Sequence, residues 1–306
     1  MCNLRHSYAG YLRLMQMSAI QLYVFVEGKQ CDPYFFAEAC SATLGSQVTY
    51  EIVIARKLPG NSGGKQALLS FFIYLRGRSS LITILGGNKT ACIFFLDKDL
   101  DDLQRRKKRS MHVVYTQHYD VQNYVFEHGD LTKGSAVAAS IDPHRLESDL
   151  DDSSQWCRQI AILWRDWVAL CMQMIIDGIP CEANYRVLSP VQTRLCGPVD
   201  PVALNAFTSK IARRHHIPVA ELRNKLGSYI KRIDHYLKRG EHHRVFKGKW
   251  FVSILADDID RIMGGDFYDN DSLARRLQST ITATLDFSEP WADYFKQSLI
   301  DIANML

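Results

Sequence analysis

The chain has 306 residues, 47% of them hydrophobic, which is enough for a core in one large domain or two modest ones. Its net charge is only +4, from 37 Lys and Arg against 33 Asp and Glu, so the placement of charge is more informative than the total. The eight cysteines include no C-x-x-C pair, which argues against a zinc ribbon or a disulfide framework and predicts reduced thiols.

The first twenty residues have neither the continuous apolar core nor the small-residue cleavage site of a signal peptide. No later window approaches the ~20 apolar residues that span a bilayer. We therefore expect a soluble protein of the cytoplasm with no membrane segment.

Strand and helix patterns alternate in the first part of the chain. Expected strands cover residues 22–26, 48–54, 91–96 and 111–115, and expected helices cover residues 34–42 and 66–75. Asp32 and Pro33 are expected to be the N-cap and the first residue of the first helix. This alternation predicts βαβ units, and hence an α/β domain with a mainly parallel sheet flanked by helices.

The hydrophobic period becomes helical after about residue 135. Residues 156–174 carry one apolar stripe at helical spacing, and residues 222–237 carry another. Asp200, Asp271 and Glu289 are expected to begin further helices. With a polar connector at 140–152, the pattern predicts an α/β domain at 1–135 and an all-helical domain at 136–306.

Three carboxylates follow two of the expected strands. Glu27 comes directly after residues 22–26, and Asp97 and Asp99 come directly after residues 91–96. If the second strand persists, Asp97 and Asp99 point to the same side, and if the strands are neighbours all three residues meet at one sheet edge. Crowded carboxylates need a counter-charge, and Mg²⁺ supplies it with oxygen ligands.

A solvated turn is the alternative interpretation of D-K-D-L-D-D at 97–102, and for that motif alone it is the better one. The pairing with Glu27, about 70 residues earlier and within βαβ spacing, favours the metal site instead. Asp101 and Asp102 stay open between a secondary ligand and a helix cap.

These motifs resemble the Toprim domain of topoisomerases, bacterial primases and OLD-type nucleases. Val26-Glu27-Gly28 and Asp97-Lys98-Asp99 match its signature, and the wider pattern VEGKQCDPYFF, FFLDKDLDD and HYDVQNYVF resembles the Toprim nucleases of phage defence, most narrowly the AriB group of the PARIS systems. The motifs cover about residues 20–130. The resemblance implies that Glu27, Asp97 and Asp99 bind Mg²⁺ or Mn²⁺ in a nuclease. For the AriB group it also implies toxic cleavage of host transfer RNA and an ABC-type ATPase partner, AriA.

The third motif departs from the family pattern. Related sequences read Glu-Asn-Tyr where this chain has Gln122-Asn123-Tyr124, and an amide is a poor substitute for an anionic ligand. Either Asp120 or Glu127 takes that role, or the site holds its metals differently. A purely structural turn at Asp120 and Gln122 is an equal alternative.

Basic residues are concentrated in two segments. The run RRKKR places Arg105, Arg106, Lys107, Lys108 and Arg109 directly after the acidic motif. Residues 213–249 hold eleven Lys and Arg against three Asp and Glu, including Lys231, Arg232, Lys247 and Lys249. Both segments are expected to contact a nucleic-acid backbone, with solvated surface or an acidic protein partner as the alternatives. Aromatic residues 229, 236, 246 and 250 are expected either to stack bases or to pack in the core.

Two other motifs are rejected. The loop PGNSGGK lacks Walker A spacing, because Gly60 is one position too close to Gly64 and Gln66 replaces the required hydroxyl residue; Lys65 could still contact a phosphate. The pairs His215-His216 and His242-His243 lack zinc spacing and are expected at the surface. His118 is a weak candidate for a general base.

We therefore expect a Toprim endonuclease that cleaves RNA, with Lys29 or Lys98 near the phosphate. The rivals are a DNA-cleaving OLD-like nuclease and a catalytically idle Toprim module that holds a partner ATPase. A homodimer is a further expectation, since one small site gives little grip on a substrate.

Overall fold

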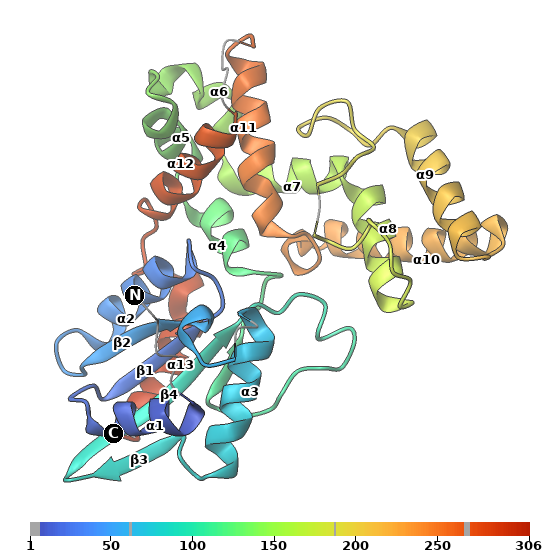
Figure 1. Cartoon of the computed structure of the whole chain (residues 1–306). Helices are drawn as coiled ribbons and strands as arrows, with labels where there is room; N and C mark the ends of the chain where they lie inside the picture. Colours follow the sequence, from blue (N-terminus) through green and yellow to red (C-terminus); the bar gives the residue numbers. More distant parts are fainter. Residues whose placement is uncertain (1–6, 61–62, 187, 266–269) are drawn as a thin grey trace, which may run out of the picture. The chain divides into compact units, whose positions relative to one another are not determined.

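The computed structural model describes residues 7–60, 63–186, 188–265 and 270–306 (Figure 1). By packing, the described chain forms two compact units. Unit 1 contains residues up to 97, residues 107–116 and residues 286–306, whereas unit 2 contains residues 98–106 and 117–285. The predicted division at residue 135 is a division by role, between a catalytic domain and a helical domain. Packing does not test it, so it stays a prediction.

Unit 1 is built on a mixed sheet of five strands. The strands are β1 (Leu22–Val26), β2 (Tyr50–Ile54), β3 (Ile82–Leu85), β4 (Asn88–Leu96) and β5 (Val113–Tyr115). The order is β2-β1-β4, and β4 pairs on its other side with β3 and with β5. All pairs are parallel except β3 with β4, so the predicted mainly parallel sheet is confirmed.

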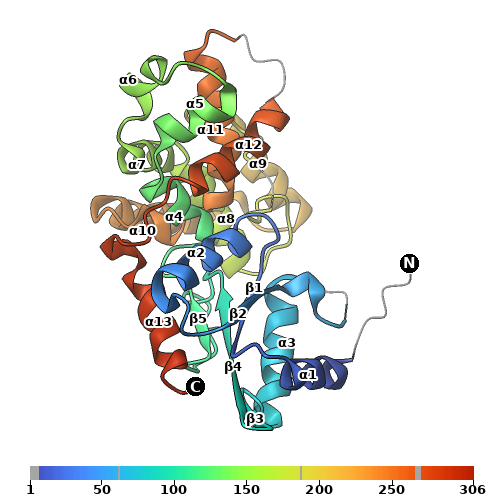
Figure 2. The same ribbon diagram turned by 90° about the vertical axis from the view of Figure 1, so that its left-hand side faces the viewer.

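Helices cover both faces of the sheet in unit 1. They are α1 (Tyr8–Met17), α2 (Asp32–Leu44), the 3₁₀ turn η1 (Ala55–Lys57), α3 (Gly64–Gly77), η5 (Pro290–Ala292) and α13 (Asp293–Ala303). Figure 2 shows α1 and α3 on one side of the sheet and α2 and α13 on the other. Alternation along β4 serves both layers, because Phe94 packs on Phe72 of α3 and Phe95 packs on Phe36 of α2.

The sequence pattern did not predict helix α1 or the short antiparallel strand β3, and it placed the start of α2 one residue too late. The N-cap of α2 is Cys31, so Asp32 is the first helical residue and not the cap. Its carboxylate instead accepts a hydrogen bond from the Gly28 backbone, 2.6 Å away, at the turn after β1.

The regular elements of unit 2 are all helices or 3₁₀ turns in its described residues. Its helices and 3₁₀ turns are α4 (Val121–His128), α5 (Leu131–Ala139), η2 (Pro143–Arg145), α6 (Glu147–Leu150), α7 (Ser153–Leu163), α8 (Arg165–Ile176), α9 (Pro201–Arg214), α10 (Val219–Lys238), η3 (His242–Arg244), η4 (Gly248–Trp250), α11 (Phe251–Ile262) and α12 (Asn270–Thr282). The predicted helical character of the C-terminal part is confirmed.

The two predicted helical stripes fared differently. The stripe at 156–174 is divided between α7 and α8, which bend by 68° around Trp164. The stripe at 222–237 is one helix, α10, with Leu222, Leu226, Ile233 and Leu237 buried. The Asp200 carboxylate caps α9 as predicted. The predicted start at Asp271 falls in α12, but its side chain lies outside the described residues.

Within the described ranges, no single helix is both long and apolar enough to cross a membrane. Only the bent pair α7 and α8 together has that length and composition, and most of its large apolar side chains are buried in unit 2. All seven described cysteines are free thiols, and Cys2 lies outside the described residues.

Candidate functional site

Glu27 and Asp97 follow neighbouring parallel strands of unit 1. The pairing of β1 with β4 sets Val26 opposite Phe95, so both strands release their next residues at the same edge of the sheet. There the Asp97 backbone N–H donates to Glu27 Oε1 over 2.8 Å. The predicted neighbourhood of these two residues is therefore confirmed.

The turn that carries Glu27 depends on the absence of a side chain at Gly28. A Cβ at this position would lie 2.6 to 2.8 Å from the Asp32 carboxylate, which is the group that accepts from the Gly28 backbone N–H. Glycine therefore allows Asp32 to hold the turn tightly. Lys29, which we expect near a phosphate, is exposed just beyond it.

Asp99 and Lys98 belong to unit 2 and do not continue the strand. β4 ends at Leu96, and Asp99 has a left-handed backbone with φ of 50°, so the argument that places Asp97 and Asp99 on one side of a strand fails. The Asp99 N–H donates to the Tyr119 carbonyl over 2.8 Å. Lys98 is buried, and its Nζ donates to the Gln117 carbonyl over 2.9 Å. Roles for Asp99 and Lys98 at the metal and the phosphate stay predictions.

The third motif starts α4. Asp120 is the buried N-cap of this helix, and its Oδ1 accepts from the Asn123 backbone and side chain. Its Oδ2 faces the Lys249 backbone N–H at 3.3 Å. The structural turn that was the alternative to an Asp120 metal ligand therefore has direct support. Gln122 is buried as well, and its amide oxygen accepts no hydrogen bond from the described residues.

The segment FKGKW packs directly on this cap. A Cβ on Gly248 would collide with the Asn123 backbone and the Asp120 carboxylate, so only glycine fits there. The Asn123 side chain also donates to the Phe246 carbonyl over 3.1 Å. Lys247 is half-buried and donates to the Tyr185 carbonyl, and its predicted contact with nucleic acid stays a prediction.

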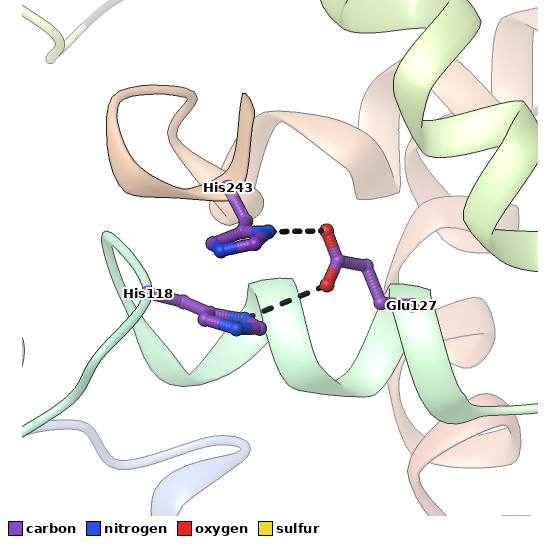
Figure 3. A group of neighbouring side chains, drawn as sticks. All are labelled: His118, Glu127 and His243. Atoms are coloured by element: carbon purple, nitrogen blue, oxygen red, sulfur yellow. Dashed lines mark ion pairs between the residues drawn. The ribbon is translucent and has the colours of Figure 1, made fainter. Parts of the chain in front are cut away.

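A cluster of imidazoles around Glu127 was not predicted. At the last turn of α4, the Glu127 carboxylate lies 3.0 Å from His242 Nε2, 3.3 Å from His243 Nδ1 and 3.6 Å from His118 Nδ1. Figure 3 shows His118 and His243 stacked beside the carboxylate, each facing one of its oxygens. The predicted surface position of His242-His243 is wrong, because His242 is only 4% exposed.

Burial and proximity set the charges in this cluster. Burial would raise the pKa of Glu127, but the His242 and His243 rings outweigh it and lower that pKa, so the carboxylate stays ionised. Burial lowers the pKa of His118 well below its usual value, despite the opposing effect of Glu127, so this ring is neutral at ordinary pH.

The predicted nucleic-acid contacts are mostly at the surface. The five residues of the run 105–109 are all exposed, as are Lys231, Arg232 and Lys249. The aromatic residues offer no continuous stacking platform, because Phe246 and Trp250 are buried. Of the rejected loop PGNSGGK, Asn61 and Ser62 lie outside the described residues, and α3 starts at Gly64.

No protein-family model matches the sequence, and the curated proteins contain no detectable relative. The function must therefore be argued from the residues and their geometry.

Proposed function

We propose that this protein is a metal-dependent Toprim endonuclease that cleaves RNA, with transfer RNA as its substrate class. One observation carries the proposal: Glu27 and Asp97 leave neighbouring parallel strands at one sheet edge, and Glu27 Oε1 is held by the Asp97 backbone. Carboxylates gathered beyond the carboxyl ends of parallel strands are a common arrangement for ligand and cation binding in open α/β sheets.

The donor set fits Mg²⁺ or Mn²⁺. Glu27 and Asp97 offer carboxylate oxygens, the ligands that these hard cations prefer, and the motif adds Asp99 to them. The hydrogen bond from Asp97 and the Asp32-held turn fix the direction of the Glu27 side chain before any ion arrives. Bound there, the ion would activate water and neutralise charge developing on a phosphodiester.

A nucleic-acid substrate is supported by the distribution of exposed cations, and the choice of RNA over DNA is proposed from the AriB resemblance. The run 105–109 follows the acidic motif in sequence, and its five exposed Lys and Arg side chains suit a phosphate backbone. The preference for transfer RNA, the role as toxic effector of an anti-phage defence system and an ABC-type ATPase partner are proposed from the AriB resemblance alone.

The test compares the purified wild-type chain with Glu27→Ala on transfer RNA and on duplex DNA, each with Mg²⁺, Mn²⁺ or EDTA. We expect cleavage of transfer RNA that requires the cation and the carboxylate. Cleavage that survives EDTA or Glu27→Ala would refute the metal model. Cleavage of DNA alone would favour an OLD-like nuclease, and no cleavage under any condition, with or without an added partner ATPase, would favour an idle module.

The buried amide at position 122 provides a second test. Glutamate has nearly the same shape as glutamine, so Gln122→Glu restores the family's carboxylate with little change in volume. The Gln122 amide oxygen accepts no hydrogen bond from the described residues, so the change removes none from this atom. We expect this variant to lower the Mn²⁺ concentration for half-maximal cleavage by about tenfold, as expected for an additional anionic ligand. Gln122→Met is the matched control without an oxygen. An unchanged or raised Mn²⁺ requirement for Gln122→Glu would remove position 122 from the metal site.

A further inference from the structure

We propose that His118, Glu127 and His243 form a second metal site, which binds a divalent transition metal of the zinc class. This site is separate in chemistry from the all-oxygen site of the proposed nuclease. Imidazole nitrogens combined with one carboxylate are typical ligands of Zn²⁺, Co²⁺ and related ions, and poor ligands of Mg²⁺.

The separations between the ligand atoms suit one ion. Carboxylate oxygens of Glu127 lie 3.6 Å from His118 Nδ1 and 3.3 Å from His243 Nδ1, and the donor atoms of the three residues all lie within 4.8 Å of one another. Metal–ligand bonds of about 2.0 to 2.1 Å correspond to ligand–ligand edges of about 3.3 Å in a tetrahedron. Both distances are close to this edge length, but His118 faces Oε2 and His243 faces Oε1, so a single ion uses both carboxylate oxygens or requires a small turn of the carboxylate.

The cluster is buried, and its polar atoms are poorly satisfied as a protein-only arrangement. The exposed fractions of the side chains are 12% for His118, 7% for Glu127 and 22% for His243. Among the described residues, Glu127 Oε1 and both ring nitrogens of the 4% exposed His242 lie in no aligned hydrogen bond. A buried carboxylate oxygen without an aligned donor calls for a further partner, and an ion bound by His118, Glu127 and His243 would supply one to Glu127.

Binding requires a local rotation of the rings. His118 and His243 are stacked with centroids 3.8 Å apart and planes 25° apart, whereas an ion must lie in the plane of each ring. A turn of each imidazole about its Cβ–Cγ bond brings the Nδ1 lone pair toward the carboxylate. His242, at 3.0 Å from Glu127 Oε1, then serves as a positioning residue that holds the ligand carboxylate.

An acidic pocket lies beside Glu127, one of the three ligands. This pocket has a volume of about 430 Å³ and is lined by Glu127 together with Asp130, Asp151 and Asp152. Several carboxylates around one opening raise the local concentration of cations. Because η3 and α4 both contribute ligands, the bound ion would tie residues 242–244 to α4, adding to the 2.7 Å hydrogen bond from the Tyr119 backbone to the His243 carbonyl.

The test uses metal-free full-length protein with Glu27→Ala, so that the first site does not interfere. Zn²⁺ is titrated by calorimetry, and Co²⁺ is titrated while its tetrahedral visible absorption is recorded. We expect one ion per chain and a raised thermal midpoint with Zn²⁺. His243→Gln and Glu127→Gln, which retain bulk and polarity, should each weaken binding by more than about 100-fold, because loss of a ligand exceeds loss of an outer partner.

His235→Ala is the matched control, because this histidine is exposed on α10. The Zn²⁺ affinity of this variant should equal that of the parent. Circular dichroism identifies variants that fail to fold, and for these His118→Asn is substituted. No saturable Zn²⁺ binding by the folded parent would refute the proposal. Unchanged affinity in the folded His243→Gln and Glu127→Gln variants would refute it equally, because the ion would then bind elsewhere.

Discussion

Glu27 and Glu127 are the same functional group in two contrasting environments. Glu27 is half-buried after β1 and is held by a backbone N–H, which has no charge and does not titrate. Glu127 is 7% exposed at the C-terminal turn of α4, where the helix dipole disfavours an anion, and it is surrounded by three imidazoles. The carboxylate oxygens gathered near Glu27 suit a hard cation, whereas the nitrogen donors around Glu127 suit a transition metal.

The largest expected effect separates the two carboxylates by activity. Glu27→Gln should lower RNA cleavage by at least about 100-fold, the scale for losing one preorganised electrostatic contact. Glu127→Gln should remain within a few-fold of the parent, because its carboxylate is occupied by imidazoles. Cleavage rates at saturating Mn²⁺ provide the measurement. A comparable loss in both variants would assign Glu127 to the catalytic metal and end the contrast.

The free energy of unfolding should depend more on Glu127 than on Glu27, the reverse of the order expected for cleavage. Glu127→Ala removes the one anion among buried imidazoles and should lower the free energy of unfolding by about 3 kcal/mol, as expected when one partner of a buried pair is deleted. Glu27→Ala should lower it by less than about 1 kcal/mol, because the side chain is only half-buried and its hydrogen bond from the Asp97 backbone N–H involves an uncharged donor. Urea denaturation in EDTA measures both values. Equal losses would show that Glu27 is a structural residue.

The turn behind Glu27 can be disturbed without touching the carboxylate. In Gly28→Ala the new methyl group meets the Asp32 carboxylate at 2.6 to 2.8 Å, so the bond from Asp32 to the turn must break. We expect a loss of about 2 kcal/mol in the free energy of unfolding, together with weaker Mn²⁺ binding. Gly227→Ala on α10 is the control, because a Cβ at this position would meet no neighbouring heavy atom within 4 Å and alanine favours helix by up to about 1 kcal/mol. Tolerance of alanine at both positions would contradict the fixed turn.

The smallest effect concerns pH. The pKa of His118 is lowered in the folded chain, so the unfolded chain binds the extra proton first and the folded state loses stability as the pH falls below 6.5. Between pH 6.5 and 5.5 the loss should be about 1 kcal/mol, and the lowered pKa of Glu127 should add a further loss below pH 4.5.

Urea titrations in EDTA across this range test the expectation. His118→Phe keeps a ring between Tyr124 and His243 but cannot titrate, so its stability should be flat over the upper step. An equal pH dependence in this variant would assign the step to another group.

The oxygen-rich site was readable from sequence because strand and ligand are adjacent along the chain. A buried apolar run followed at once by Glu27, and another followed by Asp97, identify a shared edge once both strands are placed in one parallel sheet. The prediction that Asp97 and Asp99 point to the same side of a strand was wrong, because β4 ends at Leu96 and Asp99 adopts a left-handed backbone.

The imidazole cluster could not be found by spacing. Its members come from the loop before α4, the end of α4 and η3, so more than a hundred residues separate His118 from His243. The one available signal was the adjacent pair His242-His243 in a segment whose neighbours, Val245 and Phe246, are apolar. Metal spacing rules detect ligands that share a helix or a hairpin, and this cluster shares neither.

The return of α13 to the sheet bears on when unit 1 can fold during synthesis. Phe295 packs against Phe36 and Phe95, so the α2 side of the sheet lacks part of its cover until residues near 295 have left the ribosome. The strands that carry Glu27 and Asp97 are made about 200 to 270 residues before Phe295. The sheet of unit 1 therefore waits for a distant part of its own chain before its α2 face is covered, and the edge that carries Glu27 and Asp97 is held by a scaffold completed late in synthesis.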